Sequence, residues 1–133
     1  MRLLVLDENE LLAWMAERLA PPGTEVRGFT SFDEARRALL EDPPDAAVVC
    51  VTAARLPWRE FGRLCASRRP PVPVLYESCV FGSAEEAGLE PEEGSVRFLH
   101  TPASRADLNE ALVRLLNDAR EGRERPVSEA ASP

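Results

Sequence analysis

The chain has 133 residues, a hydrophobic content of 44% and a formal net charge of −7, which suits a single globular domain with its own core. The acidic charge argues against nucleic acid or an anionic membrane surface as a partner, because both need clustered positive charge. No apolar run approaches the roughly 20 residues of a membrane helix, so we expect a cytoplasmic protein. Its three cysteines lack the spacing of a disulfide framework, and we expect them to be reduced.

All 16 basic side chains are arginines, and the chain contains no lysine. Isoleucine and glutamine are also absent, while alanine, arginine and proline are abundant. Biased genomic base composition produces the same pattern, so the missing lysine has an explanation that is unrelated to function. Its physical consequence is the same either way, since no site in this chain has a lysine ammonium group.

Strands are indicated by apolar runs too short for helices, and helices by apolar residues at spacings of three and four. Three serines, each followed three positions later by an acidic residue, indicate helix starts at Ser31, Ser83 and Ser104. In chain order the patterns predict a strand over 2–6, a helix from 9 to 20, a strand over 24–29, a helix from 32 to 40, a strand over 46–51, a helix over 58–67, a strand over 72–76, a short helix from 83 to 88, a strand over 96–99 and a helix from 104 to 119.

Five strands alternating with five helices predict a parallel sheet with helices on both faces. We expect one domain over residues 1–119, followed by a disordered C-terminal tail or linker over 120–133. In such sheets the functional crevice lies beyond the carboxyl ends of the strands. The residues expected there are Asp7 and Glu8, Cys50 and Thr52, Tyr76 to Cys79, and His100 to Pro102.

Three segments resemble those of bacterial response-regulator receiver domains, and the resemblance covers about residues 2–119. VLDEN is similar to the acidic motif that ends the family's first strand, with Asp7 and Glu8 in the places of the magnesium-binding carboxylates. PDAAVVCV is similar to the third strand, and FLHTP to the fifth, where the family has an aromatic residue and then Lys-Pro. The resemblance implies an α/β, flavodoxin-like (βα)5 three-layer sandwich with strand order 2-1-3-4-5.

The resemblance also implies a chemistry, which this sequence does not match. Receivers accept a phosphoryl group on an aspartate at the end of the third strand, supported by magnesium and the lysine, and a Ser or Thr on the fourth strand senses the product. Here the acceptor place falls on Cys50, the lysine place on Thr101, and the Ser/Thr place on Tyr76 or Glu77. Only the paired acids and the aromatic residue, Phe98, match the family. Without acceptor and cation, we predict no aspartyl phosphorylation.

Three other charged residues can be considered as replacements for the missing groups. Asp45 begins the third strand, about 5 residues at ~3.3 Å each from Cys50, and therefore lies at the opposite edge of the sheet. Glu77 lies at the correct edge, but we expect a free carboxylate beside Asp7 and Glu8 to repel them or to share a cation with them rather than to accept a phosphoryl group. Arg55 is the nearest arginine by sequence that could stand in for the lysine.

Two metal or redox alternatives concern the same edge. Asp7 and Glu8 offer oxygen ligands to a weakly held divalent cation, and no other cofactor is expected; alternatively, they form a structural pair at the start of the first helix. Cys50, Cys79 and His100 would suit zinc or a thiol redox pair, and hence a metal- or redox-responsive sensor. The simpler interpretation is that Cys50 fills the space of the missing aspartate and His100 is an exposed loop residue.

We interpret the chain as a phosphorylation-independent, receiver-like signalling module that acts through protein–protein interaction and is not an enzyme. The candidate partner-binding residues are Trp58, Phe81, Arg105 and Arg114, and the resemblance implies that the last helix and its flanks serve docking or homodimerisation. A weak flavodoxin-like ligand binder is an alternative. It is disfavoured because no glycine-rich phosphate loop follows any strand.

Overall fold

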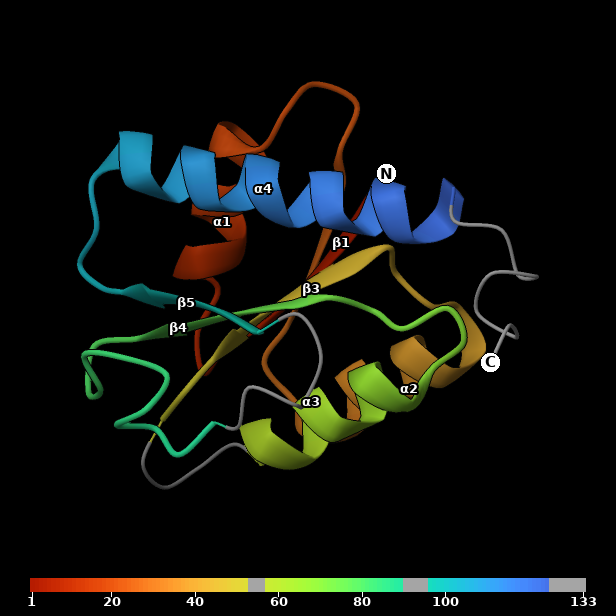
Figure 1. Cartoon of the computed structure of the whole chain (residues 1–133), viewed down its shortest axis with the longest axis horizontal. Helices are drawn as coiled ribbons and strands as arrows, with labels where there is room; N and C mark the ends of the chain where they lie inside the picture. Colours follow the sequence, from red (N-terminus) through yellow and green to blue (C-terminus); the bar gives the residue numbers. More distant parts are fainter. Residues whose placement is uncertain (53–56, 90–95, 125–133) are drawn as a thin grey trace, which may run out of the picture.

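The computed structural model is a three-layer sandwich in which five parallel strands form one sheet in the order β2-β1-β3-β4-β5. It describes residues 1–52, 57–89 and 96–124. Helices α1 and α4 cover one face of the sheet, and α2 and α3 cover the other (Figure 1). The predicted fold class and strand order are confirmed. The elements are β1 (Arg2–Leu6), α1 (Leu11–Leu19), β2 (Glu25–Phe29), α2 (Phe32–Glu41), β3 (Ala46–Cys50), α3 (Trp58–Ser67), β4 (Val74–Ser78), β5 (Val96–His100) and α4 (Arg105–Glu124).

The sheet separates two hydrophobic cores. Strands β3 and β4 are buried at all five positions, as expected for parallel strands covered on both faces. Alternate residues of each strand enter opposite cores because successive side chains point to opposite faces. The core on the α1/α4 face includes Val5, Val48 and Leu112. The core on the α2/α3 face includes Val49 and Phe61.

The last helix, α4, follows the predicted pattern but runs further. The Ser104 hydroxyl accepts a hydrogen bond from the Asp107 backbone N–H at 3.0 Å, which caps the first turn. The leucines at helical spacing in this segment, Leu108, Leu112, Leu115 and Leu116, are all buried. The helix ends at Glu124, so residues 120–124, which the sequence placed in a tail, are helical. The remainder of the predicted tail, 125–133, lies outside the described residues.

The short helix predicted over 83–88 is wrong, because the structure has turns there. The predicted cap contact does form, since the Glu86 N–H donates to the Ser83 hydroxyl at 3.2 Å. Gly88 then adopts a left-handed conformation with φ of 76° and closes the turn. A single turn gains little from its own hydrogen bonds, and between Ser83 and Leu89 only Ala87 and Leu89 are buried. The segment therefore lacks the apolar face that would extend it into a helix.

Strand β4 lies two residues later than predicted, at Val74–Ser78 instead of 72–76. Pro73 has no N–H for the ladder, and it contributes its carbonyl to the Ala47 N–H at 3.0 Å. The strand therefore begins after Pro73 and continues through the polar residues Glu77 and Ser78, because β3 and β5 pair with it on both sides. This shift moves Glu77 from the expected strand end into the buried part of the sheet.

Among the helices of the described ranges, none combines the length and the apolarity that a bilayer crossing requires.

Candidate functional site

Three strands bring one thiol and two carboxylates together at the carboxyl edge of the sheet. Asp7 follows β1, Cys50 ends β3, and Glu77 lies opposite Cys50 in the β3–β4 register. One ligand-type atom from each, a carboxylate oxygen or the Cys50 Sγ, lies within 4.8 Å of the other two. All three side chains are buried, with exposed fractions of 8% for Asp7, 9% for Cys50 and 8% for Glu77.

The alternation of side chains along the strands explains this convergence. Asp7, Cys50 and Glu77 each lie two positions after a residue of the core on the α1/α4 face, and a spacing of two keeps side chains on one face. Those core residues are Val5, Val48 and Leu75. The site is therefore the polar end of that core, at the carboxyl ends of the strands.

The surroundings of these groups favour their uncharged forms. Burial raises the pKa of the Cys50 thiol far above its ordinary value, and the negative charges of Glu77 and Asp7 raise it further. Burial and the charge of Asp7 raise the pKa of Glu77 to about 7, against a hydrogen bond from Cys50 that lowers it. The other oxygen of Glu77, Oε2, is buried and has no hydrogen-bond partner.

This environment limits what Cys50 can do. The thiolate is the nucleophilic form of cysteine, and both burial and the neighbouring carboxylates oppose its formation. Two adjacent carboxylates also repel an anionic phosphodonor. The arrangement instead suits the binding of a proton or a cation.

Tyr76 and Glu77, the two residues considered for the Ser/Thr place, lie on opposite faces of β4. Tyr76 belongs to the core on the α2/α3 face, where its ring packs edge-on against Trp58 at a centroid distance of 6.0 Å. A Cβ atom on Gly62 would lie 1.8 Å from the Tyr76 hydroxyl, so the hydroxyl approaches α3 through the space that glycine leaves. Only Glu77 of the two contributes to the site.

Ser78 lies in the segment expected at the crevice, although the sequence assigns it no role of its own; it ends β4 and is fully buried. Its hydroxyl donates to the Val51 carbonyl at 3.1 Å. The same hydroxyl accepts hydrogen bonds from the N–H groups of Val80 and Phe81, both at 3.0 Å. Ser78 therefore ties the ends of β3 and β4 to the loop that follows. Because the predicted strand ended at Tyr76, Ser78 was expected only after the strand, whereas β4 continues through it.

Glu8, the second residue of the acidic pair, is exposed and lies outside the three-residue cluster. Its backbone N–H donates to Asp7 Oδ1 at 2.6 Å, which orients the Asp7 carboxylate. The Asn9 side chain accepts from the Leu11 N–H at 2.9 Å, at the start of α1. Asp7 therefore belongs to the buried site, whereas Glu8 lies in the exposed segment before α1.

The residues of β5 and its end lie beside the site instead of within the cluster. Phe98 is half-buried and pairs with Tyr76 in the β4–β5 register. The Thr101 N–H donates to the Ser78 carbonyl at 2.9 Å. Arg55, considered as a substitute for the lysine, lies outside the described residues. Asp45 lies at the opposite edge, as expected, where its carboxylate accepts from the Arg2 N–H at 2.6 Å.

The alternative grouping of Cys50 with Cys79 and His100 does not form among the described residues. The metal-compatible cluster of the described residues contains Cys50 but neither of the other two. Cys79 is exposed, and His100 Nδ1 lies 3.1 Å from the Phe81 carbonyl oxygen. All three cysteines are free, and Cys65 is buried in the core of the α2/α3 face.

The candidate partner-binding aromatic residues are partly packed. Trp58 is half-buried, and its indole N–H donates to the Thr52 carbonyl at 3.0 Å. The Arg59 guanidinium lies over the Trp58 ring, 4.9 Å from its centroid. Phe81 is also half-buried and packs against the core of the α2/α3 face. These contacts fix both rings close to the surface.

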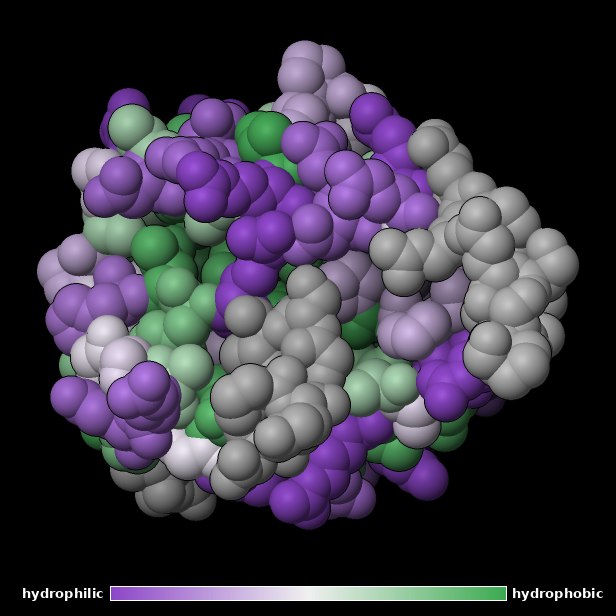
Figure 2. Space-filling model, in the orientation of Figure 1, coloured by the Kyte–Doolittle hydropathy of each residue, from purple (hydrophilic) through white to green (hydrophobic). Residues whose placement is uncertain are grey.

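The face formed by α4 and the edge strand β5 combines charge with apolar surface. Figure 2 shows a hydrophilic outer face on α4 and hydrophobic residues beside β5. Arg105 is exposed, and Arg114 pairs with Glu110 at 2.6 Å within the helix. Arg97 of β5 and Asp118 of α4 form an ion pair at 2.5 Å, which fastens the helix to the edge of the sheet.

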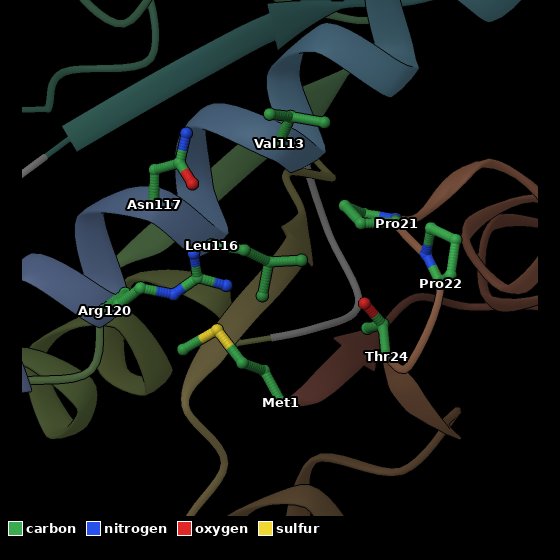
Figure 3. A pocket seen from close by; sticks show the side chains of 8 residues that line it. All are labelled: Met1, Pro21, Pro22, Thr24, Val113, Leu116, Asn117 and Arg120. Carbon is green, nitrogen blue, oxygen red and sulfur yellow. The ribbon is translucent and has the colours of Figure 1, made fainter.

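A pocket of about 320 Å³ lies at the opposite end of the sheet, between the start of β1, the turn after α1 and the last turns of α4 (Figure 3). It is lined by Met1, Pro21, Pro22, Thr24, Val113, Leu116, Asn117 and Arg120. Because Met1 precedes β1 and Asp7 follows it, the length of the strand separates this pocket from the carboxyl-edge site.

No protein-family model matches the sequence, and no curated protein matches it. Solved structures do. The chain is similar to a response regulator receiver domain protein from Clostridium thermocellum, at 21% identity and a TM-score of 0.71, over 90% of this chain and 96% of that chain. It is also similar to a CheY-like receiver domain protein from Methanospirillum hungatei, at 16% identity and a TM-score of 0.75, over 90% and 96% of the two chains. The chemotaxis response regulator CheY4 of Vibrio cholerae matches at 19% identity and a TM-score of 0.72, over 86% and 98%.

These comparisons show which fold the chain shares with known proteins. The chain has the fold of response-regulator receiver domains, with five parallel strands in the order 2-1-3-4-5 and four helices in the described residues.

Proposed function

We propose that the chain is a receiver-like signalling module that works without aspartyl phosphorylation and acts through contacts with a protein partner. The observation that carries this proposal is the environment of Cys50 at the end of β3, where the resemblance expects the aspartate that accepts the phosphoryl group. The thiol there is buried between Asp7 and Glu77, and its pKa is raised. A buried, protonated thiol beside two acids is a poor phosphoryl acceptor.

The missing cation supports the same proposal. Phosphoryl transfer relies on positive charge at the transferring oxygens, and the place that the resemblance assigns to the lysine holds Thr101. Within residues 1–52, 57–89 and 96–124, no arginine forms an ion pair with Asp7 or Glu77. The chain keeps the receiver fold but lacks the acceptor aspartate and the lysine. We therefore infer that it acts through its surfaces and has no catalytic activity of its own.

The partner surface that we favour is the face of α4 and β5, together with the loop that carries Phe81. An edge strand and a charged helix offer both apolar and ionic contacts to a protein. Three free cysteines suit a reducing compartment, so we place this interaction in the cytoplasm.

The proposal is tested by incubating the protein with Mg²⁺ and acetyl phosphate and measuring its intact mass. We expect the mass to stay unchanged, while a receiver with a complete acceptor site, treated in parallel, gains a phosphoryl group. A phosphoryl adduct on this chain that hydroxylamine removes, as it removes acyl phosphates, would refute the proposal. An adduct that disappears in Cys50→Ala would refute it as well.

A further inference from the structure

The cluster of Asp7, Cys50 and Glu77 has the layout of a ligand set. Its donor atoms come from the ends of three neighbouring strands and lie within 4.8 Å of one another. The strands are paired through the sheet ladder, so the backbone positions of the three residues are fixed relative to each other. A site built on strands of a rigid sheet is more sharply positioned than one built on loops.

One atom of this cluster lacks the partner that its burial demands. Glu77 is 8% exposed, and its Oε2 has no hydrogen-bond partner. A buried carboxylate oxygen without a partner is costly, and buried charges in proteins are normally paired or bound to metals. In the described part of the chain, neither Glu77 nor Asp7 forms an ion pair with an arginine. A cation between the two carboxylates would satisfy the orphaned oxygen.

We propose that Asp7, Cys50 and Glu77 bind one divalent transition-metal ion of the zinc class through one thiolate and two carboxylates. The proposal rests on the proposed function, because Cys50 is available as a ligand only where it does not accept a phosphoryl group. It extends that function by giving the same edge of the sheet a ligand.

The donor set selects the class of metal. Magnesium and calcium take oxygen ligands, whereas a thiolate favours zinc and related transition metals. Zinc lies about 2.3 Å from sulfur and about 2.1 Å from carboxylate oxygen, which sets tetrahedral donors roughly 3.5 Å apart. Donor atoms already within 4.8 Å reach that spacing through small side-chain rotations. Three protein ligands leave a fourth position for water or for a side chain of a partner.

The charges balance without any redox step. A dication bound to one thiolate and two carboxylates leaves a site with one net negative charge, and the protons held by the free ligands pass to solvent on binding. Glu8 is exposed and outside the cluster, so the pair of ligands is Asp7 with Glu77 and not the adjacent acids of the sequence motif.

Cobalt(II) provides the test, because a cobalt–thiolate bond gives a charge-transfer absorption that carboxylates alone do not. The untagged chain is first stripped with a chelator and then titrated with Co²⁺ and, separately, with Zn²⁺ as competitor. We expect one Co²⁺ per chain, a thiolate band, and loss of that band when Zn²⁺ displaces cobalt.

Variants assign the band to this site. Cys50→Ser should abolish it, and Glu77→Gln should weaken cobalt binding at least tenfold, since each removes a ligand. Cys79→Ser is the matched control: it removes an exposed thiol near the same edge and should leave the band unchanged. Circular dichroism of each metal-free variant checks that it folds. If Cys50→Ser does not fold, Glu77→Gln, which keeps the shape of the side chain, still tests the site.

A folded wild-type chain that shows no thiolate band, or a band that Cys79→Ser removes and Cys50→Ser retains, would overturn the proposal. Binding that Glu77→Gln leaves unchanged would also overturn it. These measurements report metal binding and not phosphoryl transfer. A negative result for the metal site can therefore be distinguished from a negative result for the proposed function.

Discussion

Glu77 on β4 lies directly opposite Cys50 on β3 in the parallel register, so a buried carboxylate faces a buried thiol at the carboxyl edge of the sheet. Both groups favour their protonated forms in the absence of a cation, chiefly because of burial. The stability of the metal-free protein should therefore depend on the protonation of this pair.

Glu77→Gln should remove a pH dependence of stability. Burial raises the pKa of Glu77 from 4.5 to about 7, so the folded state binds this proton more tightly than the unfolded state. The resulting stability is fully present below pH 4.5 and is lost as the pH rises through 7. Between pH 5 and pH 8 this loss is about 2–3 kcal/mol.

Urea unfolding in the presence of a chelator, at pH 5 and at pH 8, measures that loss. Wild type should lose stability across the interval relative to Glu77→Gln, and the variant should be the more stable protein at pH 8. Glu8→Gln, on an exposed neighbour, is the control and should follow wild type. Identical pH dependence in wild type and Glu77→Gln would contradict the burial of an unpaired carboxylate.

Gly62→Ala should destabilise the protein because its Cβ would lie 1.8 Å from the Tyr76 hydroxyl. Alanine gains about 1 kcal/mol in helix propensity over glycine, but overpacking costs about 1–3 kcal/mol. We expect a net loss in the Tyr76 background and a much smaller loss, or a gain, in the Tyr76→Phe background. A double-mutant cycle by denaturant unfolding tests this. Equal effects in both backgrounds would show that the hydroxyl does not occupy the space beside Gly62.

Ser78→Ala should cost about 2–3 kcal/mol, since it strips partners from the Val51 carbonyl and from two N–H groups of the following loop. Ser83→Ala removes one hydrogen bond in a solvent-facing turn and should cost less than about 1 kcal/mol. Thermal and urea unfolding of the two variants compare the costs directly. If Ser83→Ala were as damaging as Ser78→Ala, the assigned role of Ser78 would be wrong.

Installing the missing groups should restore acceptor chemistry if the family places are assigned correctly. We expect Cys50→Asp/Thr101→Lys to gain a phosphoryl group from acetyl phosphate in the presence of Mg²⁺, because the pair supplies both acceptor and cation. Thr101→Lys alone should stay unmodified. The phosphoryl group is detected by intact mass, measured with and without hydroxylamine. If Thr101→Lys alone were phosphorylated, the assignment of Cys50 to the acceptor place would be wrong.

The sheet could be predicted from the sequence because its signals are local and strong. Apolar runs such as AAVVC allow little besides a buried strand, and serine caps located the starts of α2 and α4 through contacts that form as expected. At the ends of the helices, apolar spacing predicted burial less well. Leu11 and Leu40 lie at helical spacing with apolar neighbours, yet they are 60% and 39% exposed, because the first and last turns of a helix extend beyond the core.

The site could be predicted only in part because it depends on register. The sequence placed Asp7, Cys50 and Glu77 at one edge, but the burial of Glu77 directly opposite Cys50 follows from a shift of β4 by two residues. That shift is set by pairing with β3 and β5, which local patterns do not encode. Cys79 and His100 stay outside the cluster because Cys79 follows the end of β4 and His100 ends the edge strand β5, and both are exposed.

We propose that the carboxyl edge of this sheet does not respond to phosphorylation. The most direct measurement follows backbone amides by NMR while Mg²⁺ and beryllofluoride, a mimic of the phosphoryl group, are added. We expect no chemical-shift changes that spread from Asp7 and Cys50 to Phe98. Saturable shifts spreading from the end of β3 to β5 would contradict this account, because they would reveal an acceptor site that still switches the fold.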